Sequence, residues 1–231
     1  MDAKDIGQLQ QIIYNCKNNA KNTIRKSEAE ENAEIYREVI QTHNIPSQYL
    51  NAKFTDYNFP KKSIITGYLR NLKENTKNGI GLFVTGDTGT GKTRLCYAYM
   101  KKYIWDYIRV KNSKEVCYIS FNKLHADIIN AEKSDQSNIK KTYAGYKLLI
   151  VDEFAVKDLT DAQVDNFLEI LNIRNHNKPC GKPTVIISNQ NLESIKESAG
   201  GAIYSRIKGN SVIYHMNSED KRSIKNRLKL D

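Results

Sequence analysis

The pattern of apolar and polar positions changes near residue 80. Beyond that point, short apolar runs with strand-like composition lie at 81–86, 115–120, 147–154, 183–190 and 211–216. Between the runs, apolar residues recur every three or four positions, which predicts helices over 94–108, 123–131 and 161–175, with short helices between the last two runs. This alternation is typical of βαβ units. We therefore expect an α/β fold, with a mainly parallel sheet flanked by helices.

The first 50 residues show only helical spacing. One narrow apolar stripe consists of Ile6, Leu9, Ile12, Ile13 and Cys16. A second stripe, with Ile35, Tyr36, Val39 and Ile40, ends near Pro46, because the residue before a proline disfavours helix. Either stripe could dock on the chain's own core or bind a partner protein. We expect a small helical segment over 1–50 and a separate domain over 51–231.

The charge is unevenly distributed. The chain of 231 residues has 36 Lys and Arg against 26 Asp and Glu, a formal net charge of +10. Residues 1–53 hold seven basic and seven acidic side chains, so the whole excess lies in 54–231. A basic domain fits a polyanionic partner such as nucleic acid, and it equally fits a lysine-rich solvated surface.

Two further features of the composition bear on location. The four cysteines are scattered without a C-x-x-C pair, which argues against a disulfide framework or a zinc ribbon and fits a reducing compartment. The longest apolar runs have about five residues, far fewer than a bilayer span needs, and the N-terminus lacks the order of a signal peptide. We expect a cytoplasmic protein with no membrane partner.

The most specific motif follows the first apolar run. GDTGTGKT, residues 86–93, fits the phosphate-loop pattern G-x-x-x-x-G-K-[ST], in which glycines let successive backbone N–H groups face phosphate oxygens. Lys92 would reach the β- and γ-phosphates, and the Thr93 hydroxyl would bind Mg²⁺. The predicted nucleotide-binding residues are Gly86, Asp87, Thr88, Gly89, Thr90, Gly91, Lys92 and Thr93.

A pair of carboxylates ends a later apolar run. LLIVDEF, residues 148–154, puts Asp152 and Glu153 at the end of a buried-type strand. Asp152 could hold the Mg²⁺ shell, and Glu153 could orient and deprotonate an attacking water. The pair therefore favours hydrolysis over a nucleotide that only stabilises the fold.

Three polar residues further along are less specific. Asn189 could bond the lytic water or the γ-phosphate, or it could cap the helix that follows. Arg206 could act as a finger on a neighbour's nucleotide, or it could be an ordinary surface arginine. Arg222 is ambiguous in the same way.

The order of these motifs, continued by YSRI and SEDKRS, is similar to that of AAA+ ATPases of the DnaC/IstB group, and most to DnaC-type replicative helicase loaders. The resemblance runs over about 28–228 and includes Phe54 and Tyr57, which lead into the nucleotide domain. It implies an AAA+ core that uses ATP and Mg²⁺ and assembles with copies of itself. It also implies Asn189 as sensor 1, Arg206 as the trans-acting finger and Arg222 as the sensor 2 arginine. Because the sequence continues only about nine residues beyond Arg222, we expect no full C-terminal helical lid.

The leading hypothesis is an ATP-dependent loader that delivers a replicative DnaB-type helicase onto single-stranded DNA, with residues 1–50 binding the helicase. The alternative is an IstB-type transposition helper that acts on duplex DNA. Glu153 argues against a third reading, in which ATP only organises binding. The candidate DNA contacts are lysines and aromatic side chains, namely Phe121, Lys123, Lys140, Lys141 and Tyr143. The alternative is that the ring of Phe121 belongs to the core and the lysines are merely solvated.

Overall fold

The computed structural model describes residues 27, 29–38, 40–41, 46–57, 59, 63–107, 115–155, 158–176 and 181–216. The first apolar stripe and Arg222 lie outside the described residues, so their predicted roles stay predictions.

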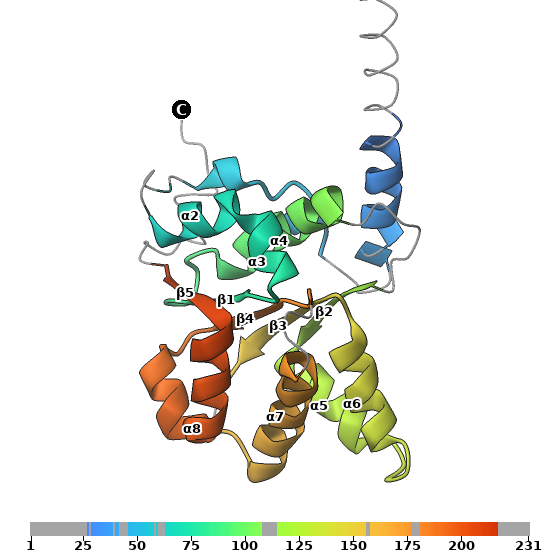
Figure 1. The fold of residues 1–231 in the computed structure, drawn as a ribbon, viewed down its shortest axis with the longest axis vertical. Helices are drawn as coiled ribbons and strands as arrows, with labels where there is room; N and C mark the ends of the chain where they lie inside the picture. Colours follow the sequence, from blue (N-terminus) through green and yellow to red (C-terminus); the bar gives the residue numbers. More distant parts are fainter. Residues whose placement is uncertain are drawn as a thin grey trace, which may run out of the picture.

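A five-stranded sheet forms the centre of the fold (Figure 1). Its strands pair in the order β2-β3-β4-β1-β5, and every pair is parallel. This confirms the α/β fold expected from the sequence. Because the strands are parallel, their carboxyl ends meet at one edge of the sheet, where ligands bind in open α/β folds. The strands are β1 (Gly81–Thr85), β2 (Val116–Ser120), β3 (Leu148–Phe154), β4 (Thr184–Ser188) and β5 (Ser211–His215).

Helices cover both faces of the sheet (Figure 1). One face carries α2 (Ile64–Arg70), α3 (Leu72–Lys77) and α4 (Lys92–Tyr107), and the other carries α5 (Phe121–Ile129), α6 (Gln136–Gly145), α7 (Asp161–Asn175) and α8 (Leu192–Asn210). Two short 3₁₀ helices, η1 (Ser47–Tyr49) and η2 (Phe54–Asp56), precede α2. The alternating side chains of each strand fill two apolar clusters, one on each face.

The helix expected over 94–108 begins earlier, at Lys92, directly after the glycine-rich loop. The apolar spacing did not predict α2, α3 or α6. The first two span only seven and six residues, and α6 buries only Ala144, so none carries an extended apolar stripe.

The second apolar stripe docks on the chain's own core. Residues 29–38 are helical, and Ile35, 5% exposed, belongs to the same apolar cluster as the side chains of α4. Lys101 of α4 lies over the Tyr36 ring, with Nζ 5.3 Å from the ring centroid. This part of the predicted N-terminal segment therefore packs against the domain that follows it.

None of the helices in the described part of the chain is long and apolar enough to span a bilayer.

Candidate functional site

A cavity of about 1020 Å³ opens at the carboxyl edge of the sheet. The glycine-rich loop after β1 and the first turn of α4 form its floor, and the ends of β2, β3 and β4 form one side. Residues from 46–57 form a further wall. The cavity therefore brings together the two motifs singled out by the sequence and a segment that precedes the domain.

The loop needs its glycines for two reasons. Gly86, Gly89 and Gly91 have φ values of 139°, 88° and 98°, which L side chains rarely adopt. A Cβ at Gly86 would also lie 2.4 Å from the backbone oxygen of Met216, which follows β5. The chain can thus curl tightly between β1 and α4 only with glycine at these positions.

Lys92 is held inside this curl. Its side chain is buried, and Nζ donates hydrogen bonds to the backbone oxygens of Gly86 at 2.6 Å and Asp87 at 2.7 Å. Thr90 is also buried and donates to the Asp87 oxygen at 2.9 Å. Of the eight predicted loop residues, those in the cavity lining are Thr88, Gly89, Gly91, Lys92 and Thr93.

Asp152 is a buried carboxylate at the site. It is 7% exposed, and its Oδ2 accepts a hydrogen bond from Thr93 Oγ1 at 3.0 Å and another from the Tyr118 hydroxyl. Its Oδ1 accepts from the backbone N–H of Glu153 at 2.7 Å. The sequence predicted Thr93 and Asp152 as Mg²⁺ partners, and the structure brings their oxygens together on the cavity wall.

These oxygens fit a magnesium ion by their chemistry. Mg²⁺ prefers hard oxygen ligands and is usually held by one or two protein oxygens together with water and substrate phosphates. In the described residues, no three His, Cys, Asp or Glu side chains converge to hold a metal by themselves. Thr93 and Asp152 would thus supply the protein's share of a Mg²⁺–phosphate site.

Glu153 occupies a strained position beside Asp152. Its φ is 58°, and β3 contains one more residue than β4 between the pairs Val151–Ile186 and Phe154–Ser188. Glu153 lies in this bulge, is exposed and helps to line the cavity. Positive φ in a residue with a side chain costs about 1–3 kcal/mol and tends to be retained at functional sites.

The structure separates the two readings of Asn189. The N-cap of α8 is Asn191, whose Oδ1 accepts from the backbone N–H of Ser194 at 2.8 Å. Asn189 instead is exposed and lines the cavity just after β4. Helix capping therefore does not explain Asn189, and its predicted role toward a phosphate or a water stays open to test.

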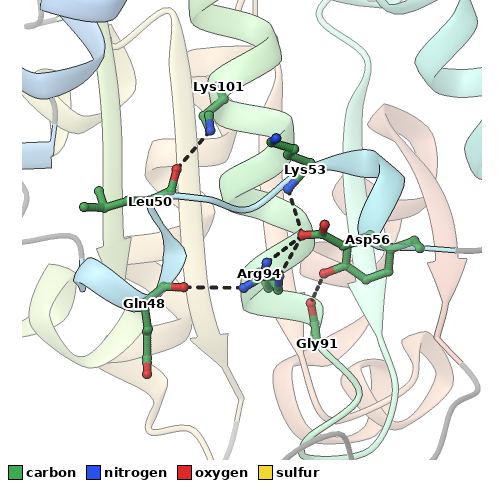
Figure 2. A network of polar contacts seen from close by, with 8 residues as sticks. Gln48, Leu50, Lys53, Asp56, Gly91, Arg94 and Lys101 are labelled. Atoms are coloured by element: carbon green, nitrogen blue, oxygen red, sulfur yellow. Dashed lines mark hydrogen bonds and ion pairs between the residues drawn. The ribbon is translucent and has the colours of Figure 1, made fainter. Parts of the chain in front are cut away.

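The wall formed by 46–57 is fixed to the start of α4 (Figure 2). Arg94 bonds Asp56 Oδ2 through Nε at 2.9 Å and Nη2 at 2.7 Å, and the backbone N–H of Lys53 donates to the same oxygen at 3.0 Å. The Lys53 hydrogen bond and the Arg94 charge lower the pKa of Asp56. Tyr57 donates its hydroxyl proton to the backbone oxygen of Gly91 at 2.8 Å, which joins this wall to the glycine-rich loop.

Three tyrosines at the site were not predicted. Tyr97 of α4 stacks on Tyr49 with a centroid distance of 4.8 Å and on Tyr118 at 4.6 Å, and all three line the cavity. They come from η1, α4 and β2, and no sequence motif joins them. Tyr118 lies on the same face of β2 as Ser120, and Ser120 is paired with Asp152 of β3. The closeness of Tyr118 to Asp152 could therefore be inferred only once β2 and β3 were known to be neighbours.

The pKa values of two groups near Asp152 are raised. Burial raises the pKa of Tyr118, and the charge of Asp152 raises it further. Burial also raises the pKa of the Cys96 thiol well above its usual value, and the nearby Asp152 acts in the same direction. Cys96 is therefore a neutral packing residue.

Arg206 lies away from this cavity. It is on α8, is not in the cavity lining, and its Nε donates to Asn172 Oδ1 of α7 at 2.8 Å. The structure thus does not bring Arg206 to the chain's own phosphate loop.

The candidate DNA contacts need one correction. Phe121 is 2% exposed and packs edge-on against Phe154 and Phe167, with centroids 5.0 Å and 5.5 Å away, so it belongs to the core and cannot stack on a base. The other candidates lie on α5 and α6. Lys123 pairs with Asp127, which also accepts from Tyr143, while Lys140 pairs with Glu169 and Lys141 is exposed.

The family model described as IstB-like ATP binding protein matches residues 26–227. No curated protein matches the chain.

Solved structures share the fold. A DnaC helicase loader is 20% identical with a TM-score of 0.58, covering 74% of this chain and 100% of that chain. DnaI is 18% identical with a TM-score of 0.57, covering 76% and 96%. AMPPCP-bound DnaA from Aquifex aeolicus is 16% identical with a TM-score of 0.57, and the match covers 74% of this chain but only 51% of the DnaA chain. At these identities the likeness shows the fold alone, which is the AAA+ core expected from the sequence.

Proposed function

Because the chain belongs to the family of IstB-like ATP-binding proteins, we propose that it is an ATPase that loads a replicative DnaB-type helicase onto single-stranded DNA. The single observation that carries the catalytic part is the meeting of four groups in one cavity. Lys92 and Thr93 of the loop, Asp152 and the strained Glu153 all line it.

Each group has a distinct part in hydrolysis. Lys92 and the loop N–H groups bind the phosphates, and Thr93 with Asp152 holds Mg²⁺, which neutralises charge on the phosphates. Glu153 is exposed to the cavity, so it can orient a water for attack and accept its proton. Asn189, on the neighbouring strand end, is the second polar group placed to bond that water or the γ-phosphate.

The loading part of the proposal is supported by the fold and by the sequence pattern of the N-terminal segment. The DnaC helicase loader has the same fold over its whole length. The second stripe packs on the core, which leaves the first stripe, Ile6 to Cys16, as the candidate helicase contact.

The test is a pull-down of a DnaB-type helicase by the full chain, with two matched variants. Leu9→Asp with Ile13→Asp puts two charges into the stripe, and Gln11→Asp with Asn18→Asp puts two charges on the opposite side of the expected helix. We expect the first pair to abolish capture and the second to leave it unchanged. Equal capture by both pairs would contradict the helicase contact.

The family match favours a second candidate, because the model is named for the IstB group. In that case the chain assists a transposase on duplex DNA. DNA binding separates the two: we expect single strands to be preferred, with Lys123 and Lys141 neutralising backbone phosphates on the face that carries α5 and α6. Replacing both lysines by Ala should reduce the salt dependence of log K by about 1.4, since each phosphate contact on a single strand contributes about 0.7.

The control for this measurement replaces Lys73 and Lys77, which are exposed on α3 on the other face of the sheet. Their removal should leave the salt dependence unchanged. A preference for duplex DNA together with capture of a transposase would favour the IstB-type function.

A further inference from the structure

We infer that Tyr118 is a positioning residue for Asp152 and that its hydroxyl controls how well the site takes up Mg²⁺. The inference rests on the proposed function, in which Thr93 and Asp152 hold the ion.

The Tyr118 hydroxyl is one of three donors that fix the Asp152 carboxylate. It donates to Oδ2, which also accepts from Thr93 at 3.0 Å, while the Glu153 N–H occupies Oδ1 at 2.7 Å. Because both oxygens are bonded, the carboxylate cannot rotate without breaking one of these contacts. Without Tyr118, a single side-chain donor would remain on Oδ2.

The ring of Tyr118 is itself held in place. Tyr97, 1% exposed, stacks on it with a centroid distance of 4.6 Å and an interplanar angle of 21°. Tyr97 in turn stacks on Tyr49 of the cavity wall at 4.8 Å and 18°. The three nearly parallel rings brace the phenol, so its hydroxyl stays at the carboxylate.

Such a donor matters to a metal site because groups bonded to a metal-supporting carboxylate orient it. Loss of a group of this kind typically reduces metal affinity or activity by about 10–100-fold. Tyr118 therefore acts through Asp152 and need not touch the nucleotide.

The experiment measures binding of a fluorescent, non-hydrolysable ATP analogue to the full chain as a function of Mg²⁺ concentration. Tyr118→Phe removes the hydroxyl and keeps the ring. We expect the Mg²⁺ concentration at half-maximal binding to rise about ten-fold, with affinity for the analogue in EDTA unchanged within about two-fold. Tyr204→Phe is the matched control, since Tyr204 donates to Glu193 at 3.0 Å outside the cavity lining.

A double variant separates positioning from a general structural effect. In an Asp152→Asn background, Tyr118→Phe should shift the Mg²⁺ response by less than about two-fold, because residues that act as a unit are not additive. An unchanged Mg²⁺ response in Tyr118→Phe would overturn the inference, as would a full shift in the Asp152→Asn background. If Asp152→Asn alone leaves the response unchanged, the metal site of the proposed function fails instead.

Discussion

At the scale of single residues, strain and burial are concentrated where the sequence carries its chemistry. Glu153 keeps a positive φ at the end of β3, and the chain at Gly86 passes so close to Met216 that a Cβ there would lie 2.4 Å from the Met216 backbone oxygen. Asp152 is buried with three donors around it. These residues could be predicted from sequence motifs, because the phosphate loop and the carboxylate pair are each contained in a stretch of no more than eight consecutive residues.

One buried residue that belongs to no sequence motif is also held by several hydrogen bonds. Arg174 of α7 is 1% exposed, and its guanidinium donates to the backbone oxygens of Ala144, Tyr146, Lys182 and Pro183 and to Thr184 Oγ1. These acceptors lie at the C-terminal end of α6, just before β3, and at the start of β4. Arg174 therefore ties together segments far apart in the chain, which an amphipathic pattern could not reveal.

Arg174→Ala should lower the free energy of unfolding by about 3 kcal/mol, because it leaves buried carbonyls without donors. Arg174→Lys should lose less, since one ammonium can serve only part of the planar set. Urea unfolding followed by circular dichroism measures both. A loss below about 1 kcal/mol for Arg174→Ala would show that water or neighbouring groups replace the guanidinium.

At the scale of elements, the cavity depends on a segment outside the sheet. Residues 46–57 are held to α4 by Arg94 and by Lys101, whose Nζ donates to the Leu50 oxygen at 2.9 Å (Figure 2). The Tyr57 hydroxyl, which donates to the Gly91 oxygen, joins the same segment to the glycine-rich loop. Movement of this wall is thereby coupled to the first turn of α4 and to the glycine-rich loop.

Asp56→Ala should loosen the wall. The backbone N–H of Lys53 loses its acceptor, so its hydrogen-exchange protection factor should fall about five-fold, which corresponds to about 1 kcal/mol. Asp106→Ala is the control, because it removes an ion pair of similar length that lies within α4, to Lys102 at 2.8 Å. In the unaltered chain, the lowered pKa of Asp56 means that this protection is present at neutral pH and is lost only as pH falls below 3.8. Unchanged protection of Lys53 in Asp56→Ala would contradict this account of the wall.

The strands and the helices α4, α5 and α7 were predictable because each has a clear period or a continuous apolar run. The strands at 81–85, 148–154 and 184–188 are almost wholly buried, so apolar residues dominate their sequences. The stack of Tyr49, Tyr97 and Tyr118 was not predictable, because its members meet only after β2 pairs with β3 and the 46–57 segment folds over α4. The sequence left open whether Phe121 lies in the core or at the surface, because its position at the start of a helix does not reveal which side of the helix the sheet covers.

At the scale of the whole molecule, Arg206 and the phosphate loop belong to different surfaces. Arg206 is on α8, bonded to Asn172 of α7, and the cavity lies at the carboxyl edge of the sheet without it. If Arg206 serves a γ-phosphate, that nucleotide must be bound by another copy of the chain. The proposed self-association and the finger role are therefore one hypothesis.

Arg206→Ala should reduce ATP turnover by about 10³-fold, the lower range for loss of such a finger, with ATP binding retained. Mixing it with Lys92→Ala should restore part of the turnover, because each variant supplies the group that the other lacks. Lys208→Ala, which removes another exposed cation of α8, should behave like the unaltered chain. Absence of any recovery in the mixture would count against a finger that acts between subunits.

Hydrolysis of ATP in this cavity, with Glu153 as the base, is tested by comparing binding with turnover in Glu153→Gln. The substitution keeps the size and polarity of the side chain and removes its ability to accept a proton. We expect ATP·Mg²⁺ to bind within about two-fold of the unaltered chain and turnover to fall by at least about 100-fold, the usual contribution of a general base. Turnover within about five-fold of the unaltered chain would contradict the account.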